Sequence, residues 1–276
     1  MMLSCKSNIK RDENNDRPNG NNAIHADIVY VGDRSGSMEI MGDAPKNGLK
    51  EFIAEQQSTI KKEGISCSFT ICTFDIEPEE INFNDINDVK MTEEMYDNML
   101  TPRGCTRLID TALEQLEKQN KRVNEYVNNL SNEVKKLNPK ITKIFAVMTD
   151  GIDNFSEHCA SDLNEKILDA KNKGTVCLFL GANQDAIHSG EVFGFSRSNC
   201  LTFGSTPQHM AAAMRSVSSA TNRIISGQGE GFTPLERSVS QPLPNHNHNH
   251  NLNMMSSPPS LPKRDVSSLL NVNYII

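Results

Sequence analysis

The chain has 276 residues, 37% hydrophobic and 23% charged, which is enough for one sizeable domain with additional segments. Its formal net charge of −7, with no basic stripe, argues against a protein that binds nucleic acid or an anionic membrane. No window approaches the roughly 20 apolar residues of a membrane span, and the first residues lack the apolar core of a signal peptide.

The seven cysteines are an odd number and include no Cys-x-x-Cys pair. Four of them lie in or beside apolar, strand-like runs, where cysteine behaves as a small buried hydrophobe. These four are Cys67, Cys72, Cys177 and Cys200. We therefore expect free thiols in a reducing, intracellular (cytoplasmic) setting rather than a disulfide framework.

Composition divides the chain into three parts. Residues 1–22 are rich in Asn, Asp and Lys without periodicity and are predicted to form a disordered arm. Residues 23–226 carry the regular patterns of a folded domain. Residues 227–276 are dominated by Pro, Ser, Asn and Gly and are predicted to be a disordered, low-complexity tail. Its Asn-His repeat over 245–251 is either a solvated tract or a weak Zn²⁺ or Ni²⁺ binder.

In the first half of the domain, apolar runs and alternating patterns predict strands, whereas apolar residues three and four apart predict helices. The strands are expected over 27–31, 67–74 and 80–86, the last at an edge, and the helices over 45–62 and 93–100. Gly64 is expected to end the first helix.

A longer helical pattern covers 108–137, either as one helix or as two with a break near Asn120 or Asn128. Its near-heptad spacing would suit a coiled coil, but packing of this helix against the flank of its own domain is the favoured interpretation.

The rest of the domain continues the alternation of strands and helices. Strands are expected over 143–149, 175–180 and 200–203, and helices over 161–173, 185–193 and 206–225. This alternation predicts an α/β fold that is doubly wound, with a mainly parallel central sheet flanked by helices in a Rossmann-like arrangement. Ligands of such sheets bind beyond the carboxyl ends of the strands, where the strand order reverses.

The stretch 29–38 reads Val-Tyr-Val-Gly-Asp-Arg-Ser-Gly-Ser-Met, an apolar run that stops at a carboxylate and two hydroxyls. Asp33, Ser35 and Ser37 alternate, so a tight loop can direct all three side chains into one space. A carboxylate with neutral oxygens suits a hard divalent cation. The alternative interpretation is that Asp and Ser here are ordinary turn or helix-capping residues.

Two further motifs follow in order, Gly104-Cys105-Thr106 before a helical pattern and Thr149-Asp150-Gly151 at the end of a buried strand. From about residue 27 to residue 223 the chain thus resembles the von Willebrand factor type A family and its metal-ion-dependent adhesion site. The stretch 179–187, Phe-Leu-Gly-Ala-Asn-Gln-Asp-Ala-Ile, is similar to the stand-alone, intracellular members of bacteria, phages and large viruses.

The resemblance implies a metal site made of Asp33, Ser35, Ser37, Thr106 and Asp150. In the family, the two serines bind Mg²⁺ (or Mn²⁺ or Ca²⁺) through their hydroxyls, the threonine joins them in the ligand-bound state, and the aspartates act mainly through bound waters. The cation then takes an Asp or Glu carboxylate from a protein partner.

Charged residues surround these motifs. Arg34, Arg103 and Arg107 would either compete with the cation or assist an acidic partner. Asp153 is expected to add a carboxylate near the rim of the site, and Asp185 either lies at that rim or caps the helix that follows it.

Enzyme motifs are absent from the sequence, which has neither a Gly-x-Ser-x-Gly elbow nor a phosphate-binding Gly-x-x-x-x-Gly-Lys loop. His25, His158, His188 and His209 are scattered. We therefore expect a non-enzymatic, metal-dependent protein-binding module without nucleic-acid or membrane partners. The alternative is a scaffold that binds through its long helix or its tails, independently of metal.

Overall fold

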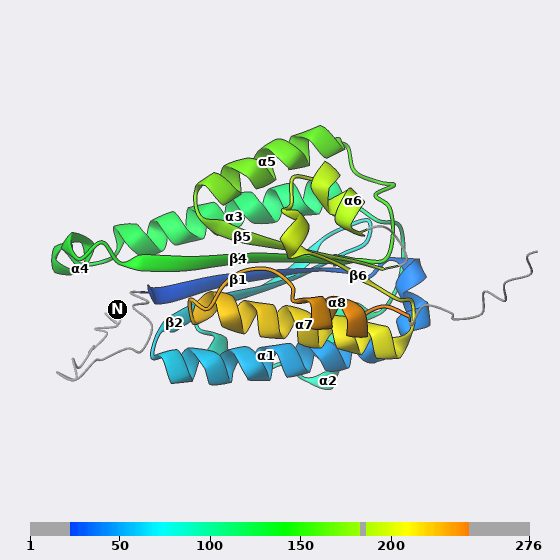
Figure 1. The fold of residues 1–276 in the computed structure, drawn as a ribbon, viewed down its shortest axis with the longest axis horizontal. Coiled ribbons are helices and arrows are strands. Elements are labelled where there is room, and N and C mark those ends of the chain that lie inside the picture. Colours follow the sequence, from blue (N-terminus) through cyan, green and yellow to red (C-terminus); the bar gives the residue numbers. More distant parts are fainter. Residues whose placement is uncertain (1–22, 183–185, 243–276) are drawn as a thin grey trace, which may run out of the picture. The chain divides into compact units, whose positions relative to one another are not determined.

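A six-stranded sheet forms the centre of the computed structural model, which describes residues 23–182 and 186–242 (Figure 1). The strands lie in the order β3-β2-β1-β4-β5-β6, with β3 antiparallel to β2 and the other neighbours parallel. They are β1 (Ala23–Asp33), β2 (Ser66–Phe74), β3 (Glu79–Phe83), β4 (Lys140–Thr149), β5 (Thr175–Ala182) and β6 (Cys200–Phe203).

Helices cover both faces of this sheet. They are α1 (Ala44–Glu63), α2 (Glu93–Leu100), α3 (Leu108–Asn128), α4 (Asn132–Lys136), α5 (Ala160–Asn172), α6 (Ala186–Val192), α7 (Pro207–Ile225) and α8 (Pro234–Val239). Figure 1 shows α3, α5 and α6 on one face and α1, α2 and α7 on the other. Each face encloses its own apolar core, because strands covered on both sides bury successive side chains in opposite directions.

The predicted fold class is confirmed, a doubly wound α/β fold with a mainly parallel sheet. The order reverses between β1 and β4, since the chain winds outward to β2 and β3 on one side and to β5 and β6 on the other. Predicted elements lie close to those observed. Gly64 ends α1 in the left-handed conformation, with φ of +66°, and the long helical pattern breaks after Asn128.

The folded chain extends beyond the predicted boundary at residue 226. Phe232 is buried against the core formed with α1 and α7, and α8 follows it. The Arg237 guanidinium donates to the carbonyls of Cys200, at 2.5 Å, and of Ser198, at 2.8 Å. The prediction of a tail from 227 onward is therefore wrong for residues 227–242. The predicted arm 1–22, the Asn-His tract and the rest of the tail lie outside the described residues.

Two contacts show how the helices pack, one between two helices and one between a helix and the sheet. On one face, α1 and α7 approach so closely that a Cβ atom at Gly48 would lie 2.4 Å from Cγ of Met214. On the other face, Arg122 of α3 forms two 2.9 Å bonds to the buried carboxylate of Asp27 in β1. In the part of the chain that the structure describes, we find no helix with the length and apolar character to cross a membrane.

Candidate metal site

The candidate site begins at the carboxyl end of β1, beside that of β4. Asp33 is the last residue of β1, and its carboxylate accepts the Ser35 backbone N–H on Oδ1 at 2.7 Å. The other oxygen, Oδ2, accepts the hydroxyl of Thr149, the last residue of β4, at 2.6 Å. Thr149 is a member of this site that the sequence analysis did not single out, although it stands in the quoted Thr-Asp-Gly motif. The register of β1 with β4 thus fixes the orientation of the Asp33 side chain.

Hydroxyls connect the three motifs. Ser35 Oγ lies 3.1 Å from Ser37 Oγ, and Ser37 Oγ donates to Asp150 Oδ1 at 2.7 Å. A Cβ atom at Gly151 would lie 3.3 Å from Thr106 Oγ1 and 3.9 Å from Ser37 Oγ, so the Thr106 hydroxyl faces the same space. The structure therefore brings together all five residues of the predicted site. Their role as metal ligands stays a prediction.

The two carboxyl groups of the site are costly to ionise. Burial raises the pKa of Asp33 to about 6, against the lowering effect of the bonds from Thr149 and Ser35. Burial also raises the pKa of Asp150, which is half-buried. Among the described residues, no Lys, Arg or His forms an ion pair with either carboxylate. A bound cation would supply the missing positive charge.

Arg34 and Arg103 do not provide that charge, because both are bound to other carboxylates. The fully buried Arg34 lies 2.9 Å from Glu79 and 3.4 Å from Asp75. Arg103 bonds to the same two carboxylates at 2.5 and 2.6 Å. The expected competition of these arginines with the cation, or their assistance to an acidic partner, therefore finds no support in this geometry.

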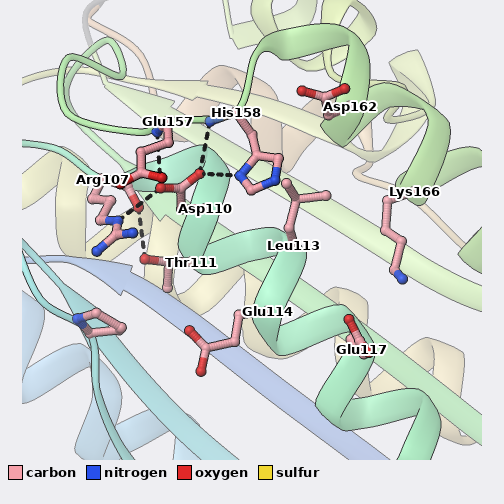
Figure 2. Close-up of a pocket in the computed structure, with 11 residues that line it drawn as sticks. Arg107, Asp110, Thr111, Leu113, Glu114, Glu117, Glu157, His158, Asp162 and Lys166 are labelled. Atoms are coloured by element: carbon pink, nitrogen blue, oxygen red, sulfur yellow. Dashed lines mark hydrogen bonds and ion pairs between the residues drawn. The ribbon is translucent and has the colours of Figure 1, made fainter.

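Arg107 is likewise engaged. Its Nε donates to Asp110 Oδ2 at 2.9 Å, and Asp110 Oδ1 lies 2.8 Å from His158 Nδ1 (Figure 2). Figure 2 shows this cluster on α3 and on the loop before α5. Its residues line a cavity of about 480 Å³. Besides the cluster, the cavity is lined by Pro78, Thr111, Leu113, Glu114, Glu117, Glu157, Asp162 and Lys166. Within this lining, hydrogen bonds join Arg107, Asp110, Thr111 and His158.

The loop that follows Asp150 caps the first turn of α3. The N-cap residue of α3, Arg107, makes no capping bond with its side chain. Instead Asp153 Oδ2 accepts the Ile109 N–H at 2.8 Å, and Ser156 Oγ accepts the Asp110 N–H at 3.0 Å. Asp153 therefore caps the first turn of α3. The prediction that it adds a free carboxylate at the rim of the site is wrong.

Thr106 is tied to the same loop. Its N–H donates to Asn154 Oδ1 at 2.9 Å, and its carbonyl accepts the Asn154 N–H at 3.0 Å. The Thr106 and Asp150 segments are thus connected through both backbone groups of Thr106. Asn154 is 48 residues from Thr106 in the sequence, so no local pattern before α3 identifies this contact.

The donor set fits a hard divalent cation. In the described ranges, no three or more His, Cys, Asp or Glu side chains form a group that could hold a metal ion. The site has two carboxylates and three hydroxyls, and such an all-oxygen set suits a cation that keeps part of its water shell.

His25 and four of the cysteines are buried in the folded domain. His25 is buried and stacks on Tyr126, with ring centroids 3.9 Å apart. Cys67, Cys72, Cys177 and Cys200 are buried free thiols, as expected, and Cys105 and Cys159 are exposed free thiols. Asp185 lies outside the described residues.

Comparison with known proteins finds likeness among solved structures only. No family model matches the chain, and no curated protein matches it. Proximal thread matrix protein 1 from the mussel byssus is 17% identical over 73% of this chain and 47% of that chain, with a TM-score of 0.47. Another structure of that protein is described as having a zinc-occupied MIDAS motif.

Two further structures show the same kind of likeness. The pilus adhesin SpaC from Lactobacillus rhamnosus GG is 15% identical over 75% of this chain and 32% of the adhesin, with a TM-score of 0.49. The SpRpn10 VWA domain is 13% identical over 76% of this chain and 100% of that domain, with a TM-score of 0.46. This chain spans about half of the byssus protein and about a third of the adhesin. A VWA domain is a von Willebrand factor type A domain, the family that the motifs resemble.

Proposed function

We propose that this chain is a non-enzymatic protein-binding module that captures an acidic side chain of its partner through a divalent metal ion. The observation that carries the proposal is the pair of Asp33, which is buried, and Asp150, which is half-buried. Both carboxylates lie among the hydroxyls of the site, and neither has a basic partner among the described residues. Two such carboxylates favour an added cation.

The residues of the site would divide the work between them. The Ser35, Ser37 and Thr106 hydroxyls would hold the ion directly. Both oxygens of Asp33 already accept hydrogen bonds, which favours contact through water rather than direct binding. When bound, the cation supplies a coordination position for an oxygen from outside. Ser37 is exposed whereas Ser35 is buried, so a partner would approach from the Ser37 side.

Magnesium is the proposed ion, with Mn²⁺ and Ca²⁺ as alternatives. Few direct protein ligands and room for waters suit Mg²⁺, which loses its water shell reluctantly. We also infer an intracellular setting, supported by the six free thiols of the described ranges, four of them buried.

Metal binding is tested by calorimetric titration of Mg²⁺ into the full chain. Asp150→Asn keeps the shape of the side chain and removes its charge, and Asp169→Asn, in an exposed pair with Lys173 on α5, is the matched control. We expect one saturable site in the wild type and in the control, and an affinity at least about ten-fold lower in Asp150→Asn. Equal titrations for all three proteins would contradict the metal site.

Partner capture is tested with immobilised peptides that carry a central Asp or, as a control, Asn. Retention of the chain by the Asp peptides in Mg²⁺ and its release by EDTA would support the proposal. Binding that ignores both EDTA and the Asp would favour the metal-independent scaffold instead. Hydrolytic activity that disappears in Asp150→Asn would contradict a non-enzymatic module.

A further inference from the structure

Four large apolar side chains stand exposed on the loops of the candidate site. The exposed fractions of these residues are 63% for Ile40, 39% for Ile76, 79% for Ile152 and 45% for Phe155. They belong to segments that follow the carboxyl ends of β1, β2 and β4. We call these four residues the apolar rim.

Ile76 is placed at the site by the loop that carries Thr106. A Cβ atom at Gly104 would lie 3.2 Å from Cγ1 of Ile76, so the isoleucine packs beside this glycine. The Gly104 carbonyl in turn accepts the N–H of Gly36, between the two serines of the site, at 3.4 Å. Ile76 therefore borders both loops.

Ile152 and Phe155 flank residues that touch Thr106 directly. Ile152 follows Gly151, whose Cβ position lies 3.3 Å from the Thr106 hydroxyl. Phe155 follows Asn154, which forms hydrogen bonds with both backbone groups of Thr106. Both apolar side chains thus stand one residue from a contact with a proposed metal ligand.

Ile40 lies in the 3₁₀ helix Gly36–Met41, which contains Ser37. Met38 and Met41 of this helix are buried in the core beneath it, whereas Ile40 is exposed. Single exposed hydrophobics are ordinary on protein surfaces. Four of them on the loops around one polar site require a common explanation.

The arginines of these loops are already paired with carboxylates. Arg103 is the basic residue nearest to Gly104 in the sequence, and its guanidinium is bound to Asp75 and Glu79. Further acidic residues on a partner would therefore gain little binding energy from the Arg103 guanidinium. Apolar neighbours would gain from being covered, because burial of apolar surface on both molecules favours association.

We propose that the apolar rim binds large aliphatic or aromatic side chains next to the acidic residue whose carboxylate completes the metal shell. The partner is then a protein segment with Asp or Glu between such residues. This inference rests on the proposed function, since the metal fixes the position of the acidic residue. The rim adds the selectivity that a single carboxylate lacks.

The test uses arrays of nine-residue peptides with a central Asp or Asn, flanked on both sides by Leu, Phe, Ser or Lys, and probed with the full chain in Mg²⁺ or EDTA. We expect Leu- and Phe-flanked Asp peptides to bind at least about ten-fold more tightly than Ser-flanked ones, and only in Mg²⁺. Two independent variants, Ile152→Ser and Ile76→Ser, should each reduce this preference, and circular dichroism checks that they fold.

The matched control is Leu137→Ser. Leu137 is 66% exposed and directly follows α4, which lies at the opposite end of the sheet from the site loops (Figure 1). This variant should keep the preference of the wild type. Binding of Asp peptides that depends on Mg²⁺ but not on the flanks, or that is unchanged in folded rim variants, would overturn the rim and leave the proposed function intact. Binding that depends neither on Mg²⁺ nor on Asp would overturn both.

Discussion

The Nε atom of Arg34 lies 3.4 Å from Oδ2 of Asp75, and the Arg34 side chain is fully buried although it stands between two residues of the metal site. Its other nitrogens donate to the carbonyls of Asn98, at 3.2 Å, and Glu77, at 3.4 Å. The Arg34 carbonyl accepts the N–H of Arg103 at 2.8 Å. Arg34 therefore fastens the β1 loop to the loop after β2, to α2 and to the segment that leads to Thr106.

We predict that Arg34→Met lowers the free energy of unfolding by about 3 kcal/mol, since it leaves carboxylate and carbonyl groups without their buried partner. Because the loops around Thr106 lose an anchor, Mg²⁺ affinity should also fall by about ten-fold or more, if the proposed site is used. Urea unfolding and calorimetric titration measure the two effects separately.

Arg103→Met is the control for this prediction. Arg103 binds the same carboxylates, but its side chain is 52% exposed. Its loss should cost less than about 1 kcal/mol. Equal losses of unfolding free energy in the two variants would show that the buried Arg34 stabilises the fold no more than the exposed Arg103.

A second prediction concerns the distant cap of α3. Asp153→Ala removes the acceptor of the Ile109 N–H, and we expect a loss of about 1 to 2 kcal/mol in the free energy of unfolding. Mg²⁺ affinity should fall too, because the same loop carries Asp150 and holds Thr106 through Asn154. Ser131→Ala, which removes the cap of the remote α4, should leave Mg²⁺ affinity unchanged. An unchanged affinity in Asp153→Ala would show that the cap serves α3 alone.

A third prediction compares two basic residues of α3 that form ion pairs. Arg122→Ala leaves the buried carboxylate of Asp27 without its two guanidinium bonds, and the expected loss is about 3 kcal/mol. Lys118 pairs with Glu80 and Glu114 and is 41% exposed, so Lys118→Ala should cost less than about 1 kcal/mol. Thermal or urea unfolding of the two variants gives the difference directly. A smaller loss for Arg122→Ala than for Lys118→Ala would refute the ranking.

A fourth prediction concerns pH. Burial lowers the pKa of His25 from 6.5 to about 4, against the opposing effect of the Asp27 carboxylate. Between these two values the unfolded chain binds a proton that the folded chain does not. The contribution of His25 to the free energy of unfolding therefore falls as pH decreases from about 6.5 to about 4, by up to roughly 3 kcal/mol.

The measurement is urea unfolding across pH 4 to 8, with His25→Gln beside the wild type. The variant should lose part of the pH dependence below about 6.5 and run parallel to the wild type above it. Identical slopes for both proteins below pH 6.5 would contradict the lowered pKa. The bonds of His25 with Ser66 and Ser68, at 2.7 and 3.2 Å, give glutamine polar partners in the same place.

The residues of the site that belong to short sequence motifs were predictable from the sequence. Asp33, Ser35 and Ser37 follow one apolar strand, and Asp150 follows another, so the parallel sheet brings both to the same edge. The pairing of Arg34 with Asp75 was not predictable, because it depends on two loops that approach only in three dimensions. The capping of α3 by Asp153 is hidden for the same reason.

The end of the domain was misjudged on composition. Polar and glycine-rich texture over 227–242 suggested a tail, and yet Thr233-Pro234-Leu235-Glu236 is a capping box with proline in the first turn. That signal could have identified α8. Burial of Phe232 could not be predicted, because it depends on the path that the chain takes after the end of α7.

The segment that contains α8 and the strand β3 both affect whether the sheets of two molecules can pair edge to edge. At one margin of the described sheet, β3 has five residues, and its Glu79 and Glu80 are bound to basic side chains. At the other margin, the Arg237 guanidinium donates a hydrogen bond to the Cys200 carbonyl, and the Ser240 carbonyl accepts the Gly204 N–H at 2.9 Å. A strand from a second molecule would have to displace these groups before it could pair. The two margins therefore oppose edge-to-edge aggregation, one by charge and the other by a covering segment.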